Sequence, residues 1–152
     1  MRTQGMVAVG LGAVLMAGLA FGGNSTTTTT SSTTTTTLFG GCAVEASFDS
    51  ILCRIDALIA SVNAASDLGR LKQGAVNSVQ KAKKQCAKAQ GAGTGKTALN
   101  QLKKCAKTLD SFRHKLASNN ARKIIPQETR DFFRDDIAAP LRSDVNALRG
   151  SL

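Results

Sequence analysis

From Phe48 onward, apolar residues recur at alternating spacings of three and four, which is the pattern of one face of an α-helix. Four segments show this pattern, and polar residues fill the positions between. The apolar positions are Phe48, Leu52, Ile55, Ile59 and Val62; Leu68, Leu71, Ala75, Val79, Ala82, Cys86 and Ala89; Ala98, Leu102, Cys105, Leu109, Phe112 and Leu116; and Phe132, Phe133, Ile137, Leu141, Val145 and Leu148. Four amphipathic helices are therefore expected, and residues 42–152 are predicted to form one all-α domain.

Turn and capping residues mark the expected ends of these helices. Ser66-Asp67 is predicted to cap the second helix, and the glycine-rich run 91–95 separates it from the third. Asn119-Asn120 closes the third, and Pro126 opens the fourth, inside which Pro140 should cause a break or kink. Short connections between long amphipathic helices favour antiparallel neighbours, so the expected fold is an antiparallel up-down four-helix bundle.

The N-terminal residues predict an export signal. An uninterrupted apolar run, residues 6–21, follows Arg2 and ends near the small residues Gly18 and Ala20, whose spacing suits signal peptidase. The run is shorter than the roughly 20 residues of a membrane-spanning helix. Residues 1–22 are therefore predicted to be a cleaved signal peptide, with an uncleaved membrane anchor as the alternative. The protein is expected to be secreted or periplasmic.

A Thr- and Ser-rich stretch follows the signal. Residues 24–37 have no apolar face to bury, so residues 23–41 are predicted to be a disordered linker. Asn24 begins a glycosylation sequon, which leaves a glycosylated stalk as an alternative to the favoured plain spacer. Cys42 lies too far from the apolar run for a lipoprotein cleavage site.

Four cysteines in an exported chain predict two disulfides. Cys86 and Cys105 lie on the apolar faces of successive helices, on either side of the glycine-rich run, so they are expected to pair. Cys53 points away from the apolar stripe of the first helix, where Cys42 can fold back to reach it. The predicted bridges are Cys42–Cys53 and Cys86–Cys105. The alternative pairing joins Cys42 to Cys86 and Cys53 to Cys105, and it requires Cys53 to turn inward.

Charge adds a candidate binding surface to this picture. The chain has a formal net charge of +10, and residues 81–123 hold twelve Lys and Arg against one acid, Asp110. Helical spacing places Lys81, Lys84 and Lys88 on one outer face, and Lys96, Lys103 and Lys107 on another. Such a surface attracts polyanions, here cell-wall polymers, acidic glycans or lipid headgroups. A solubilising, solvated Lys-rich face is the favoured alternative to such binding. Nucleic acid is disfavoured because the chain has no Tyr or Trp to stack on bases.

Other motifs do not indicate catalysis. Residues 91–97 (GAGTGKT) end like a phosphate-binding loop, but Gln90 stands where the first glycine should be, and a helix is predicted where a strand is required. His114, the only histidine, is predicted to lie on the surface. Asp131, Asp135 and Asp136 lack the spacing of a calcium loop. We therefore expect no catalytic, cofactor-binding or metal-binding residues and no small-molecule substrate, and interpret the chain as non-enzymatic.

Two resemblances bear on the function. The segments IDALIASVN (55–63), QKAKKQ (80–85), KTALNQLKK (96–104), LDSFRHKL (109–116) and IIPQETR (124–130) resemble FIMAH-type helical modules, which are accessory parts of bacterial secreted and wall-associated proteins. The resemblance covers roughly residues 50–149 and implies a non-catalytic module, although four cysteines depart from the usual pattern. The order of the predicted bridges is also similar to that of secreted invertase and pectin-methylesterase inhibitors, which implies an inhibitor-like binder of a secreted protein as the alternative.

Overall fold

The computed structural model of the chain describes residues 39–152. The predicted signal peptide and most of the predicted linker lie outside the described residues. The described part is helical apart from turns and an isolated β-bridge. Its elements are α1 (Phe48–Ala64), the 3₁₀ helix η1 (Gly69–Leu71), α2 (Lys72–Gly91), α3 (Lys96–Ala117), α4 (Asn119–Ile124), α5 (Gln127–Asp131), the π-helical η2 (Phe132–Ala138) and α6 (Ala139–Ser151). None of these helices is both long enough and apolar enough to cross a membrane.

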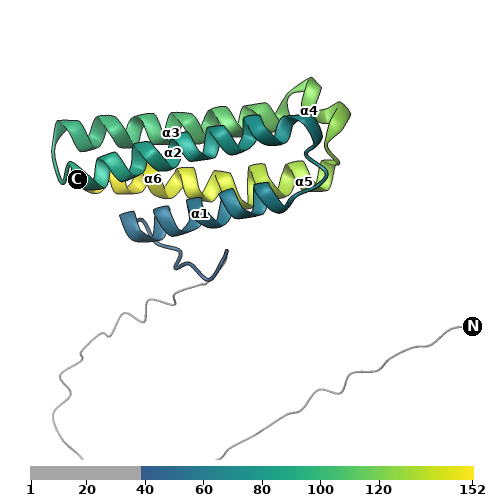
Figure 1. Ribbon diagram of the computed structural model, residues 1–152. Coiled ribbons are helices and arrows are strands. Elements are labelled where there is room, and N and C mark those ends of the chain that lie inside the picture. Colours follow the sequence, from purple (N-terminus) through teal and green to yellow (C-terminus); the bar gives the residue numbers. More distant parts are fainter. Residues whose placement is uncertain (1–38) are drawn as a thin grey trace, which may run out of the picture. The chain divides into compact units, whose positions relative to one another are not determined.

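The long helices lie side by side along their lengths (Figure 1). α1 packs against α2, α2 against α3, and α3 against both η2 and α6. Two polar contacts fix the direction of α1 relative to α2. Lys83 pairs with Asp56 at 2.6 Å, and Gln90 donates to Asp49 at 3.0 Å. Residue numbers thus rise along α2 as they fall along α1, so these two helices are antiparallel.

The second and third apolar stripes form the core as the sequence predicts. Every residue of the third stripe is at most 3 % exposed, and the second is buried except for half-buried Leu71. The first stripe is rotated by one position relative to the prediction. Ile51, Ile55, Leu58 and Val62 are fully buried, whereas the predicted positions Phe48, Leu52 and Ile59 are only partly buried against the core.

The rotation of α1 follows from a buried polar contact. Arg54, which the sequence analysis did not single out, is buried next to Ile51 and Ile55 on the inner face of α1. Its Nη1 lies 2.7 Å from Asp144 Oδ2 of α6, and its Nη2 donates to the Glu45 carbonyl at 3.2 Å. A buried cation requires such partners, so this pair holds α1 at a fixed angle to α6.

The fourth segment departs from the prediction at Phe132 and has an irregular backbone before Pro140. Phe132 is 43 % exposed, because its neighbour Phe133 takes the core position. The Phe132 ring packs edge-on against Phe133 and against Phe39. Near Pro140 the chain stays helical but its α-helical geometry is interrupted, in keeping with the break or kink that the sequence predicts. Proline has no N–H to donate and its ring crowds the preceding turn, and here the backbone just before it widens into η2, where Ala139 N–H reaches the Arg134 carbonyl.

The predicted start of the second helix is wrong. Ser66 and Asp67 precede η1, and α2 begins at Lys72 without a side-chain cap. Asp67 instead accepts a hydrogen bond from Thr129 Oγ1, which joins the α1–α2 connection to α5. Asn119-Asn120 does follow the third helix, but both residues belong to α4, for which Ser118 is the N-cap.

Both disulfides pair as the sequence predicts. Cys42 and Cys53 are joined with their Cα atoms 5.8 Å apart, and Cys53 is exposed on the outer side of α1. Cys86 and Cys105 are joined with their Cα atoms 5.6 Å apart, and both are fully buried. We call the second bridge the interhelical disulfide. It holds α2 and α3 together on the core side of the hairpin.

The predicted linker ends earlier than the sequence suggests. Residues 39–41, which were assigned to it, form a turn in which Cys42 N–H donates to the Phe39 carbonyl at 3.2 Å. Gly40 has a φ of +62°, and a Cβ there would lie 2.5 Å from the Cβ of Ala57. Only glycine allows this turn to sit so close to α1, and the turn brings Cys42 within reach of Cys53.

The exposure of the cysteines predicts the order in which the bridges open. Under limiting reductant, Cys42–Cys53 should be reduced and alkylated first, since attack by a thiolate requires access to a sulfur atom and Cys53 is exposed. The interhelical disulfide should persist until the fold opens. Alkylation followed by peptide mass spectrometry measures both. In denaturant the two rates should converge; earlier opening of Cys86–Cys105 in the native protein would contradict the burial argument.

The buried ion pair predicts a second effect. Arg54→Met should lower the free energy of unfolding by about 3 kcal/mol or more, because it leaves the Asp144 carboxylate without its cation. Lys83→Met is the matched control: the Lys83–Asp56 pair is 43 % and 53 % exposed, so its loss should cost about 1 kcal/mol or less. Denaturant unfolding compares the two. Adding Asp144→Leu to Arg54→Met should recover stability; no recovery would assign the loss to packing alone.

Candidate functional site

Polar contacts along the seam between α2 and α3 fix the geometry of the hairpin. Thr108 Oγ1 donates to Gln85 Oε1 at 2.7 Å, and Lys115 Nζ donates to Ser78 Oγ at 2.7 Å. The interhelical disulfide lies on the same seam, on its buried side. Residue numbers rise along α2 as they fall along α3, so the two helices form an antiparallel hairpin whose register is set by these contacts.

The structure places the candidate lysines on the outside of this hairpin. All six are exposed, and none forms an ion pair within residues 39–152. They are Lys81, Lys84 and Lys88 on α2, Lys96 at the first turn of α3, and Lys103 and Lys107 further along α3. Every Asp and Glu of the chain lies within residues 39–152. The positive charges of these six lysines are therefore not matched by an acidic partner.

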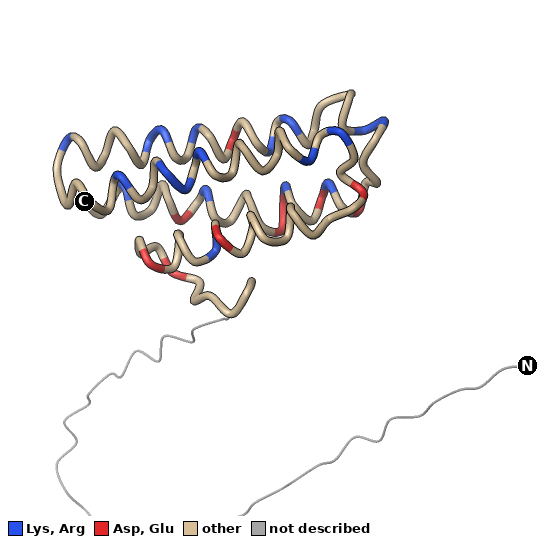
Figure 2. The backbone as a smooth tube through the Cα atoms, viewed as in Figure 1, with Lys and Arg blue, Asp and Glu red and all other residues tan. Residues whose placement is uncertain are grey.

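The acids that form ion pairs contact arginines or Lys83 rather than the six candidate lysines. Asp110, the one acid of residues 72–117, lies 2.8 Å from Arg142 Nε and 3.5 Å from Arg113 Nη1. Lys83, by contrast, turns toward α1 and pairs with Asp56. In Figure 2, Lys and Arg follow α2 and α3, whereas Asp and Glu are concentrated on α1 and the C-terminal helices. The hairpin therefore carries an uncompensated positive charge.

The seam contacts identify a lysine that sequence reasoning left out. Lys104 is exposed and lies one turn before Thr108, so it flanks the seam on the side that faces α2. Lys81 lies one turn before Gln85 and flanks the same seam from α2. Lys103, which sequence analysis preferred, is rotated by about 100° toward the α6 side. Only the contacts that show which side of each helix faces its neighbour could distinguish Lys104 from Lys103.

The glycine-rich run is a turn between two helices. α2 ends at Gly91 and α3 begins at Lys96, so no strand precedes the run as a nucleotide-binding loop requires. Gly93 and Gly95 have φ values of +67° and +103°, which favour glycine. His114 is exposed on α3, and its Nδ1 donates to the Asp110 carbonyl of the preceding turn at 2.8 Å.

Two of the acidic residues near the start of the fourth segment, Asp131 and Asp135, are ion-paired to Arg134. Arg134 lies 2.9 Å from Asp131 Oδ1 and donates to Asp135 Oδ1 at 2.9 Å. This hydrogen bond holds the pKa of the Asp135 carboxyl below its ordinary value, so the group is ionised at neutral pH. Arg130 of α5 is buried and donates to the Ile125 carbonyl.

Residues 39–152 contain no group of three or more His, Cys, Asp and Glu side chains placed to hold a metal ion. No protein-family model matches the chain, and no curated protein or solved structure is significantly similar to it.

Proposed function

We propose that this chain is an exported, non-enzymatic helical module that binds anionic surface polymers through its basic hairpin. The observation that carries the proposal is the set of exposed lysines on α2 and α3 without acidic partners. We also propose that the described residues form an antiparallel up-down four-helix bundle, in which α1, α2, α3 and the run from α5 to α6 are the four members. The antiparallel contacts of α1 with α2 and of α2 with α3 support this topology.

The physical basis of binding is electrostatic. A linear polyanion holds a layer of condensed counterions, and lysines that neutralise its charges release those ions into solution. Lysines spaced along two packed helices can meet successive charges of one polymer. The seam contacts and the interhelical disulfide hold the helices in register, so little conformational freedom of the backbone is lost on binding.

Export is part of the same proposal. The two disulfides are compatible with an oxidising compartment, and residues 1–22 have the composition of a signal peptide. We propose that the linker separates the bundle from the processed N-terminus. The resemblance to FIMAH-type modules supports an accessory role in a secreted or wall-associated setting.

The binding proposal predicts a position-dependent effect of charge removal. Changing Lys81, Lys88 and Lys104 together to Gln should make the oxidised protein elute from heparin at clearly lower salt than the unchanged protein. The slope of log K against log salt should fall by about one unit per lost contact. Salt-gradient chromatography and titration at several salt concentrations measure the two quantities.

The matched control removes the same charge elsewhere. The control residues lie away from the seam between α2 and α3; they are Lys72, Lys123 and Arg149. Changing all three to Gln should shift elution far less. Equal shifts for the two variants would mean that net charge, not the hairpin, controls retention. Elution of the unchanged protein near 0.15 M salt, roughly the physiological value, would reject polyanion binding. Salt-independent, stoichiometric capture of a secreted protein would then support the inhibitor-like alternative.

Processing of the N-terminus is a separate prediction. The protein recovered from the medium or periplasm of an expressing cell should lack the apolar run, with a new N-terminus near residues 20–23. Intact-mass measurement and N-terminal sequencing give the cleavage position. Recovery of the full-length chain in the membrane fraction would support the uncleaved anchor instead.

A further inference from the structure

A cavity of about 290 Å³ lies at the end of the hairpin nearest α4. It is bounded by the beginning of α2, the last turns of α3 and the segment that follows α4. Its walls are apolar and are formed chiefly by Leu71, Ala75, Phe112, Leu116 and Ile125. Pockets for small ligands combine such apolar walls with a few polar groups. The volume is just below the usual range of roughly 300–1,000 Å³, which limits an occupant to a small molecule.

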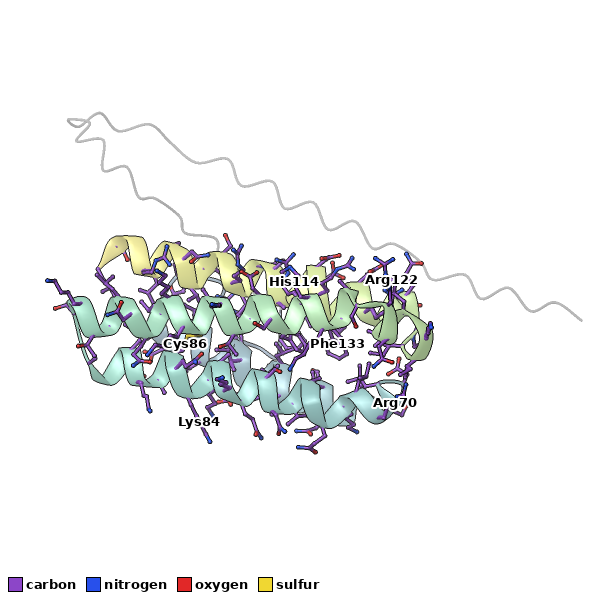
Figure 3. The ribbon with its side chains drawn as sticks, turned by 90° about the horizontal axis from the view of Figure 1, so that it is seen from above. Arg70, Lys84, Cys86, His114, Arg122 and Phe133 are labelled. Atoms are coloured by element: carbon purple, nitrogen blue, oxygen red, sulfur yellow. A yellow bond between two sulfur atoms is a disulfide. The ribbon has the colours of Figure 1, made fainter. Side chains whose placement is uncertain are left out.

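Two cations stand at the rim of this cavity, and their partners are neutral. Arg70 Nη2 donates to the Asn120 side-chain oxygen at 3.1 Å, and Lys115 Nζ donates to Ser78 Oγ at 2.7 Å. No Asp or Glu is among the residues that line the cavity. Figure 3 shows Arg70 at the same end of the bundle as Arg122. The rim therefore carries positive charge that no acid offsets, and it favours an anion.

We propose that this cavity binds a small amphipathic carboxylate, whose apolar chain enters the cavity and whose carboxylate lies between Arg70 and Lys115. A guanidinium presents two parallel N–H groups to a carboxylate, and an ammonium adds a further charge-assisted hydrogen bond. The apolar walls exclude water from the chain, which contributes the larger part of the affinity. None of the six candidate lysines of the basic hairpin lines the cavity, so this site does not depend on polymer binding.

A glycine in the wall provides a direct test. Gly74 lines the cavity, and a Cβ added to it meets no heavy atom within 4 Å. Gly74 is exposed, so a side chain at this helical position should stand at the mouth of the cavity without disturbing the core. Gly150 is also helical with open space around an added Cβ, and it does not line the cavity. Gly74→Leu and Gly150→Leu form a matched pair of variants.

The experiment is a calorimetric titration of the purified, oxidised protein with decanoate, decanol and butyrate. Decanoate should bind at least tenfold more tightly than decanol, which lacks the charge, and than butyrate, which lacks the chain. Gly74→Leu should weaken decanoate binding at least tenfold with an unchanged or higher Tm, and Gly150→Leu should leave it unchanged.

Two rim variants keep the proposal testable if Gly74→Leu fails to fold. Arg70→Gln and Lys115→Gln should each weaken decanoate binding several-fold without changing decanol binding. Equal affinity for decanoate and decanol would reject the role of the rim cations. Full binding to a folded Gly74→Leu variant, or no decanoate binding to the unchanged protein, would reject the site. Because heparin retention is measured on other residues, either proposal can fail while the other stands.

Discussion

The interhelical disulfide between α2 and α3 sets the geometry on which the other helices depend. A disulfide requires its two Cα atoms to lie within about 7 Å, which is closer than large core side chains would allow two helices to approach. Ala82 and Ala89 flank Cys86 on the same face of α2 and are fully buried, and their small side chains leave room for this approach. α1 then packs on α2, and η2 and α6 pack on α3.

Arginine and lysine have different roles in this chain. Within residues 39–152, most ion pairs use an arginine: Arg54, Arg113, Arg134 or Arg142. Lys83 is the exception among the lysines. A guanidinium donates several hydrogen bonds in a fixed plane and is less strongly hydrated than an ammonium, so it suits partly buried contacts between helices. The lysines remain in solvent, and the positive charge of the hairpin is left free for a partner.

The same hairpin offers two chemically different surfaces. Along its outer length, lysines are spread over two helices and suit an extended anion. At its end nearest α4, the helices diverge from the following segment and leave an apolar cavity with two cations at its rim. Binding of a polymer along the hairpin would depend on many weak, salt-sensitive contacts, whereas binding in the cavity would depend on burial of apolar surface. A change of salt should therefore act strongly on the first and weakly on the second.

The helical periodicity of the sequence determined the element type and the core positions of α2 and α3, and it favoured the observed pairing of the cysteines, because these follow from local spacing and from which face each side chain occupies. Three features required the tertiary structure. The rotation of α1 depends on a contact between Arg54 and Asp144, which are far apart in the chain. The choice of Lys104 over Lys103 depends on which side of α3 faces α2. The cavity depends on where α4 and the segment after it leave the hairpin. Each arises between elements, and no periodicity within one element encodes it.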